Sequence, residues 1–221
     1  IDVEYQDEIE SFVSNENCKI GKGSVTACRF VRFEQREAIE REEAFEYNFD
    51  DSKWENAILT ERLETEYCLT DCPVDTYIER LPVIKNGNCY DCGKNMSGVP
   101  VIKINAPKGE KITVRFSEEI LPNGELDLGH QHSQRFIIVS DGTNREVQPE
   151  FTWFGFRYFD IEGGAEPVFV KVIHADVPVN SSFECDNETL NWIYKTFVDT
   201  MRSNFHTGHP SDCPHLERRG Y

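Results

Sequence analysis

The sequence predicts a mainly β protein, a jelly-roll-like β-sandwich followed by the beginning of a helical region. Between residues 89 and 178, short apolar stretches alternate with turns rich in Pro, Gly, Asn and Asp at regular spacing, which is typical of a sandwich. After Pro178 the apolar period lengthens from two residues to three or four. We therefore expect a β-rich accessory region at 1–88, a sandwich at 89–178, and an incomplete helical domain from 179 to 221.

The strands of the sandwich are predicted from the turns between them. Lys111–Ser117 alternates polar and apolar residues with the period of a half-buried strand. Turns are indicated at 106–109, 121–124 and 141–142 by their Pro-Gly, Asn-Gly and Asp-Gly content. The expected strands are 99–105, 111–117, 135–140, 151–161 and 168–174.

The stretch 151–161, Phe-Thr-Trp-Phe-Gly-Phe-Arg-Tyr-Phe-Asp-Ile, is aromatic on both faces. Aromatic rings can stack on sugars, so a sugar-binding strand is one interpretation. A strand that is apolar on both faces is usually covered on both sides. We therefore expect these rings in the core of the sandwich.

One amphipathic helix is predicted at about 187–203. Asp186 is a suitable N-cap residue, and Leu190, Ile193, Tyr194, Phe197 and Met201 then recur at spacings of three and four. So short a helical region cannot close a core by itself. We expect the rest of this domain to lie outside the 221 residues.

Composition restricts the partners. The chain has 221 residues and a formal net charge of −17, which argues against binding to nucleic acid or to anionic membrane surfaces because both would repel it. No apolar stretch approaches the roughly 18 residues of a membrane helix, and no secretory leader is visible. Because the sequence starts at Ile1, we expect a processed protein or a fragment.

Eight cysteines are present. The pairs Cys68/Cys72 and Cys89/Cys92 could together supply four thiolates to zinc. The spacing between Cys68 and Cys72 is longer than in a zinc knuckle, and both pairs lie next to apolar segments typical of β-strands. Buried free thiols are the favoured interpretation, because Cys behaves as a small hydrophobic residue.

The segment from His206 to Tyr221 concentrates reactive side chains. Its possible zinc ligands match no closed zinc pattern; they are His206, His209, Asp212, Cys213 and His215. Cys213 beside His209 or His215 has the parts of a thiolate–imidazolium pair, but no third group to orient it is apparent.

A third interpretation of this segment is a carboxylate site. Asp212 and Glu217 could serve glycoside hydrolysis, which needs a carboxylic acid and a second carboxylate. Arg218 and Arg219 could hold hydroxyl groups by charge-assisted hydrogen bonds. Composition alone favours the fourth interpretation, a solvated charged loop.

Three stretches carry a family resemblance. Asp212-Cys-Pro runs on to Glu217-Arg-Arg-Gly-Tyr221, Asp91-Cys-Gly-Lys-Asn-Met-Ser-Gly98 forms a turn motif, and 151–158 reads Phe-Thr-Trp-Phe-Gly-Phe-Arg-Tyr. Residues 174–178 and 182–185 form the junction before the helical domain. Together with the three stretches, they resemble the motifs of glycoside hydrolase family 78, the α-L-rhamnosidases, and they follow one another along the chain in the same order. The resemblance covers 89–221, and the first 88 residues only loosely. Cys92 stands where the family usually has Phe, and Leu216 where it often has Arg.

The resemblance implies a β-sandwich followed by an (α/α)6 barrel that is truncated here. It implies inverting hydrolysis of terminal α-L-rhamnose, with Glu217 as the general acid and Asp212 and Arg218 as substrate-binding residues. No metal and no cofactor are implied, and the partner is a rhamnose-containing glycan or glycoside. The residues carry no signal for an oligomeric state.

The family's catalytic base lies beyond Tyr221, so we expect residues 1–221 alone to be inactive. A periplasmic or secreted location is favoured over the cytoplasm, since polysaccharide-degrading enzymes are often exported. A non-catalytic carbohydrate-binding sandwich and a zinc-dependent hydrolase are the alternatives.

Overall fold

The structure is a computed structural model. It describes residues 2–5, 8–11, 13–38, 47–61, 64–66, 72–129, 134–207, 209–210 and 213–215. The chain divides into two compact units, one made of Ile1–Ser24 with Glu40–Thr70 and the other of Val25–Ile39 with Asp71–Tyr221. We call the second the sheet unit. Within the described residues, no helix is long and apolar enough to cross a membrane.

In the part of the first unit that the structure describes, there are two short strand pairs. They are β1 (Asp2–Tyr5) with β2 (Glu8–Ser11), and β3 (Lys19–Ile20) with β6 (Glu55–Asn56). The Trp54 ring meets Phe49 edge-on, with centroids 5.3 Å apart, and lies against Gly21. Trp54 thus holds the turn before β6 in place.

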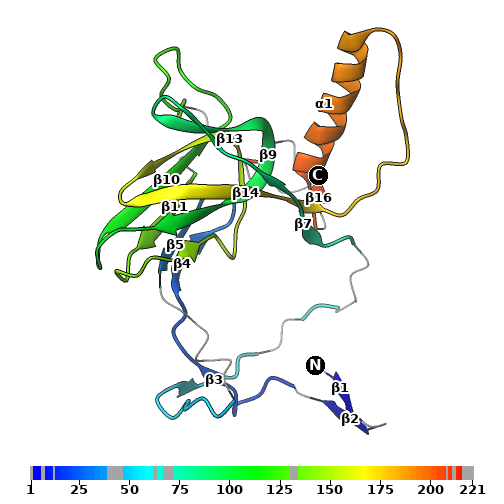
Figure 1. The fold of residues 1–221 in the computed structure, drawn as a ribbon. Coiled ribbons are helices and arrows are strands. Elements are labelled where there is room, and N and C mark those ends of the chain that lie inside the picture. Colours follow the sequence, from blue (N-terminus) through cyan, green and yellow to red (C-terminus); the bar gives the residue numbers. More distant parts are fainter. Residues whose placement is uncertain are drawn as a thin grey trace. The chain divides into compact units, whose positions relative to one another are not determined.

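The sheet unit is built on one ten-stranded sheet of order β4-β5-β11-β10-β13-β9-β14-β7, with β8 and β12 also paired to β9. The sheet curls round its own core (Figure 1). Its strands are β4 (Val25–Arg29), β5 (Phe33–Glu37), β7 (Asp75–Leu81), β8 (Ile84–Asn86), β9 (Cys89–Ile104), β10 (Lys111–Ser117), β11 (Arg135–Val139), β12 (Glu146–Val147), β13 (Phe154–Glu162) and β14 (Ala165–Ala175).

These elements confirm the mainly β sandwich, with a helix after it. The predicted strand Lys111–Ser117 is β10, and the predicted turn at 106–109 closes at Gly109, whose φ of 86° suits a residue without a side chain. The sheet also takes in β4, β5, β7 and β8, which precede residue 89. The domain ranges given above stay predictions.

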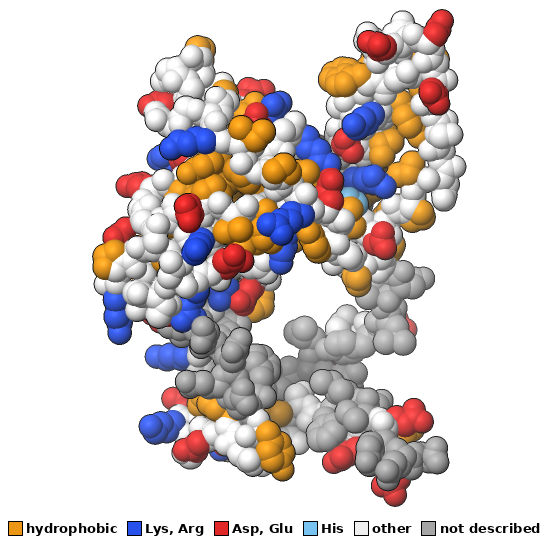
Figure 2. All heavy atoms as spheres, in the orientation of Figure 1, with side chains coloured by type: hydrophobic (Ala, Val, Ile, Leu, Met, Phe, Trp, Pro, Cys, Tyr) orange, Lys and Arg blue, Asp and Glu red, His pale blue; other side chains and the backbone are white. Residues whose placement is uncertain are grey.

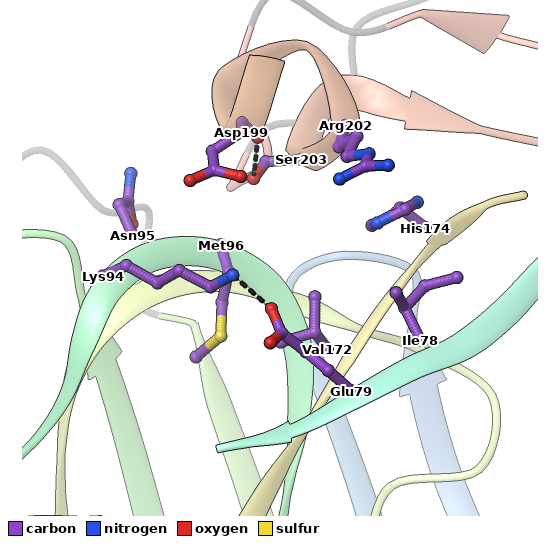
Figure 3. A pocket seen from close by; sticks show the side chains of 10 residues that line it. All are labelled: Ile78, Glu79, Lys94, Asn95, Met96, Val172, His174, Asp199, Arg202 and Ser203. Carbon is purple, nitrogen blue, oxygen red and sulfur yellow. Dashed lines mark hydrogen bonds and ion pairs between the residues drawn. The ribbon is translucent and has the colours of Figure 1, made fainter. Parts of the chain in front are cut away.

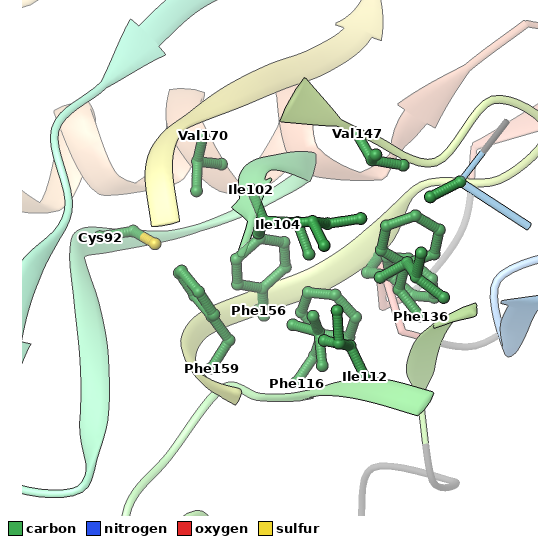
Figure 4. Close-up of a cluster of buried hydrophobic side chains, with 14 of the residues drawn as sticks. Cys92, Ile102, Ile104, Ile112, Phe116, Phe136, Val147, Phe156, Phe159 and Val170 are labelled. Carbon is green, nitrogen blue, oxygen red and sulfur yellow. The ribbon is translucent and has the colours of Figure 1, made fainter. Parts of the chain in front are cut away.

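The core of the sheet unit consists of aromatic and branched side chains that the curled sheet encloses. Phe116 stacks on Phe154 with ring centroids 4.2 Å apart. Figure 4 shows Phe116, Phe156 and Phe159 gathered beneath Ile102 and Ile104, all of them fully buried. The aromatic stretch 151–161 therefore supplies the core, as expected, although Phe151 itself is exposed.

Cys89 and Cys92 are buried free thiols, as expected, whereas Cys18, Cys28 and Cys72 are exposed, so the prediction of burial is wrong for these three. Cys92 belongs to the core, where burial raises the pKa of its thiol to about 12. The Cys89 thiol donates a hydrogen bond to the carbonyl of Gly124, with sulfur and oxygen 3.3 Å apart. Cys68, a member of the possible zinc set, lies outside the described residues.

The helix α1 runs over Glu188–Asn204 and is capped by Asn187, whose side chain accepts hydrogen bonds from the amides of Thr189 and Leu190. The prediction of Asp186 as the N-cap is therefore wrong by one residue. The Asn191 side chain fixes the register, because it both accepts from the Cys185 amide and donates to the Cys185 carbonyl.

The apolar face of α1 is largely open. Leu190, Ile193 and Phe197 are each about half exposed, and Figure 2 shows hydrophobic side chains at the surface of the helix among charged ones. Contacts with the sheet come from its last turn, where Ser203 and Asn204 are buried. The short pair β15 (Phe205–His206) and β16 (His209–Pro210) follows.

Candidate functional site

The three predicted site residues, Asp212, Glu217 and Arg218, lie outside the described residues. The structure does describe the segment that leads to them. We call residues 205–215 the terminal loop, of which 205–207, 209–210 and 213–215 are described. Two sets of contacts hold this loop against the sheet, and together they form the candidate site.

The first anchor joins the loop to the start of β7. The Thr207 amide donates to Oδ1 of Asp75 at 2.8 Å, and Nδ1 of His206 lies 2.9 Å from Oδ2. The Asp75 amide donates in return to the Thr207 hydroxyl at 2.8 Å. Both carboxylate oxygens of Asp75 are thus engaged by adjacent residues of the loop.

Electrostatics favour the ionised form of Asp75. Burial by itself would raise the pKa of this carboxyl. The hydrogen bond and electrostatic attraction of His206, with the hydrogen bonds from Thr207, outweigh that effect, and the pKa lies below its usual range. Asp75 is therefore a carboxylate at neutral pH, and it attracts a proton on Nδ1 of His206.

Trp153 provides the surface on which His206 rests. The two rings stack with centroids 3.7 Å apart and planes 11° from parallel. The His206 side chain is only 8% exposed. Its Nε2 atom is buried and has no hydrogen-bond partner among the described residues. The ring is held from two sides, by a carboxylate at one edge and by an indole across its face.

The turn between β4 and β5 supports Trp153. Phe30 meets the indole edge-on, with ring centroids 5.4 Å apart, and Val31 packs beside it in a small buried cluster with Val99. The Val31 amide donates to the Thr152 hydroxyl at 2.7 Å. Val31 has a φ of 58°, a strained conformation for a β-branched residue, so packing maintains this turn against its local preference.

The second anchor holds the other end of the terminal loop. The buried Pro214 lies directly over Gly155 of β13. The Gln134 side chain brackets Gly155, since it donates to the Gly155 carbonyl at 2.8 Å and accepts from the Gly155 amide at 2.9 Å. Nδ1 of His215 lies 3.2 Å from Oε1 of Glu118.

The residues quoted for the family resemblance meet at this anchor. Asn95 of the turn motif donates to Oε1 of Glu118 at 3.1 Å, the same oxygen that His215 approaches. Asp91 of the turn motif accepts two hydrogen bonds from Arg157, at 2.9 and 3.0 Å. The two strand motifs are thus fastened to each other and, through Gly155 and Glu118, to the loop.

Two cavities lie between the sheet and the last turns of α1. The smaller has a volume of about 30 Å³. Figure 3 shows Lys94 paired with Glu79 on its sheet side, while Ser203 donates to the Asp199 carbonyl on the helix. The larger, about 150 Å³, is bounded by Asn95, Asn204 and Pro214. Both are lined by a mixture of polar and apolar groups.

The histidines and cysteines of the terminal loop do not form a metal cluster in the described part of the chain. His206 uses Nδ1 for Asp75, and His215 faces Glu118. The sequence interpretation did not include Asp75, Trp153, Gly155 or Glu118 in the site. Gly155 could have been predicted, because it belongs to the 151–158 motif. Asp75 could not, because its partners, His206 and Thr207, are far away in the sequence.

The family models match two consecutive stretches of the chain. Residues 84–177 match the bacterial alpha-L-rhamnosidase concanavalin-like domain. Residues 178–221 match the bacterial alpha-L-rhamnosidase 6 hairpin glycosidase domain. The second match contains the terminal loop, Asp212, Glu217 and Arg218.

Individual relatives agree. An alpha-L-rhamnosidase of Alteromonas sp. (strain LOR) is 28% identical over 190 residues, which are 78% of this chain and 20% of the relative. The structure of alpha-L-rhamnosidase from Dictyoglumus thermophilum has a TM-score of 0.84 at 30% identity, over 96% of this chain and 26% of that one. Streptomyces avermitilis alpha-L-rhamnosidase complexed with L-rhamnose has a TM-score of 0.86 at 22% identity, over 96% of this chain and 22% of that one. The chain therefore spans about a fifth to a quarter of these relatives.

Proposed function

Because the chain belongs, through residues 84–221, to the bacterial alpha-L-rhamnosidase family, we propose a function for the full-length protein. It hydrolyses terminal α-L-rhamnose with inversion of the anomeric configuration. Its substrates are rhamnose-containing glycosides or plant polysaccharides. The observation that carries the proposal is that the two family matches adjoin at residues 177 and 178 and continue through the segment that bears the acidic residues.

In the proposed reaction Glu217 is the general acid, and it protonates the oxygen of the leaving group. Asp212 and Arg218 bind the hydroxyl groups of rhamnose. An inverting enzyme separates its acid and base by roughly 6.5–9.5 Å, which leaves space for the attacking water. The acid must retain its proton near neutral pH, so its surroundings must raise its pKa. A positive charge beside the Glu217 carboxyl would instead lower its pKa. We therefore propose that the Glu217 and Arg218 side chains point away from each other.

The test is hydrolysis of an aryl α-L-rhamnoside by the full-length protein and by Glu217→Gln. Loss of a general acid lowers the rate by about 10²–10⁴-fold, and the loss should be greatest for a poor leaving group such as phenol. The matched control is Glu184→Gln, which removes a carboxylate from an exposed site before α1. We expect this control to retain full activity.

Two further measurements complete the test. NMR of the first-formed sugar should show the β anomer of L-rhamnose, because inversion of an α-glycoside produces it. A chelator should leave the rate unchanged. Retained α configuration, or a Glu217→Gln variant as active as the wild type, would contradict the assignment. Activity that the chelator abolishes would favour the zinc interpretation of the His-rich loop.

A further inference from the structure

The contact between Asp75 and the terminal loop is reciprocal. Two loop donors, the Thr207 amide and Nδ1 of His206, fill one oxygen each of the Asp75 carboxylate. The Asp75 amide donates back to the Thr207 hydroxyl. Three hydrogen bonds between one residue of β7 and two adjacent residues of the loop fix both the position and the orientation of the loop backbone at this point.

The contact also fixes the chemical state of His206. A carboxylate can only accept, so the hydrogen bond places a proton on Nδ1. The other ring nitrogen, Nε2, is buried without a partner among the described residues. The contact with Asp75 and the stack on Trp153 therefore determine the placement of the ring.

The location of the contact connects it to the proposed site. His206 and Thr207 come shortly before Asp212 in the sequence, and the Pro214–Gly155 and His215–Glu118 contacts come shortly before Glu217. The sheet unit thus holds the loop on both sides of Asp212. Displacement of a reacting group by about 1 Å can lower a rate about 10²-fold, so an acid carried by this loop depends on where the anchors hold the loop.

We propose that Asp75 is a positioning residue for the hydrolysis, acting through His206 and Thr207 on the segment that carries Asp212 and Glu217. The inference rests on the proposed function. It assigns to the sheet unit an indirect part in catalysis, through the position of the terminal loop. Asp75 touches neither substrate nor reacting atoms in this role. Its effect is transmitted by the loop.

The test uses the full-length protein with Asp75→Asn and Asp75→Ala. The first variant keeps one acceptor and loses the charge, and the second loses both. The matched control is Asp176→Asn, which removes a charge from an exposed residue directly after β14, beside the start of β7. Each protein is assayed on phenyl and on 2,4-dinitrophenyl α-L-rhamnoside. Thermal midpoints establish that each variant is folded.

A misplaced acid harms the poor leaving group most. We expect Asp75→Asn to lower kcat on the phenyl rhamnoside by about 30-fold to 100-fold, with KM nearly unchanged, and kcat on the dinitrophenyl rhamnoside by less than about 5-fold. Asp75→Ala should show the larger loss. A merely structural role would lower both rates equally, and that result, or rates equal to the control, would overturn the inference.

Hydrogen exchange followed by mass spectrometry supplies a readout independent of activity. The peptide containing Thr207 should lose protection in Asp75→Ala and keep it in Asp176→Asn, because Asp75 accepts the hydrogen bond of that amide. Unchanged protection would overturn the inference even in an active enzyme. If the wild-type protein hydrolyses neither rhamnoside, the proposed function fails and takes this inference with it. Hydrolysis that is insensitive to Asp75 overturns the inference alone.

Discussion

The backbone of Pro214 lies so close to Gly155 that a β-carbon at position 155 would come within 2.5 Å of the Pro214 carbonyl carbon. The same β-carbon would lie 2.6 Å from the His215 nitrogen. These are backbone atoms, which cannot rotate out of the way as a side chain can. Glycine at 155 is therefore required by the loop that passes over it.

The Gly155→Ala variant should displace the terminal loop. We expect kcat of the full-length protein on an aryl rhamnoside to fall at least about 10-fold, because the added methyl group moves the segment that leads to Glu217. The control is Gly164→Ala, whose β-carbon would lie 3.0 Å from the α-carbon of Ala106, in the turn between β13 and β14. It should lower the thermal midpoint while kcat per folded molecule stays within about 3-fold of the wild type. Equal losses of kcat in both variants would contradict this account.

The ion pair between Asp91 and Arg157 should make stability sensitive to acid. Hydrogen bonds from Arg157 chiefly lower the pKa of Asp91. A carboxyl with a depressed folded pKa stabilises the protein above its unfolded pKa, near 3.9, and this contribution is lost as pH falls through the folded value. We expect Arg157→Met to lower the free energy of unfolding by about 1 kcal/mol at pH 7, since the pair is bidentate but partly open to solvent.

The measurement is urea unfolding of wild type and Arg157→Met between pH 7 and pH 3. The difference between the two proteins should shrink below about pH 4, as the partner carboxylate becomes protonated. Asp176→Asn serves again as the control, and its difference from wild type should stay small across the range. A difference for Arg157→Met that is constant with pH would show that the loss comes from packing of the side chain.

Cys92 should resist alkylation in the folded protein. Burial raises the pKa of its thiol to about 12, so almost no thiolate, the reactive form, exists at pH 8. Iodoacetamide at that pH should modify the exposed Cys18 within minutes and leave Cys92 intact until urea unfolds the sheet. Peptide mass mapping distinguishes the two sites. Modification of Cys92 in the native protein at the rate of Cys18 would show that this part of the core opens readily.

Phe116 should be among the most sensitive positions of the core. It is fully buried and stacks on Phe154, so Phe116→Ala leaves a large cavity and should lower the free energy of unfolding by about 3–5 kcal/mol. Phe151→Ala removes the same side chain from a position that is 59% exposed and should change stability by less than about 1 kcal/mol. Urea denaturation of both variants gives the comparison.

The elements that sequence predicted well are those with local signals. β10 follows from strict alternation between two turns, and α1 from its apolar period, because both patterns lie within a few residues of one another. The cap was misassigned because Asp186 and Asn187 are both good capping residues. In the structure the Asn187 side chain accepts from the amides of Thr189 and Leu190, and the capping preferences of Asp and Asn do not distinguish the two positions.

The contacts that anchor the terminal loop could not be predicted from local sequence patterns, because they join residues far apart in the sequence. Asp75 reads as an ordinary acidic residue at the start of a strand, and only the folded chain brings it to His206 and Thr207. The roles of Asp212, Glu217 and Arg218 come from the family resemblance and stay predictions. The membership in that family was predictable because its motifs are dense and occur in order along the chain.

The pairing of β5 with β11 has a consequence for how the protein folds. Phe33 pairs with Arg135 in parallel, although residues 40–70 and strands β7 to β10 lie between them in the chain. Closing so long a loop loses entropy before any contact compensates for it, and such non-local strand pairing is slow. The sheet should therefore assemble outward from β9, with β4 and β5 joining late. Because the turn between β4 and β5 supports Trp153, the surface on which the His206 ring stacks forms only in this last step.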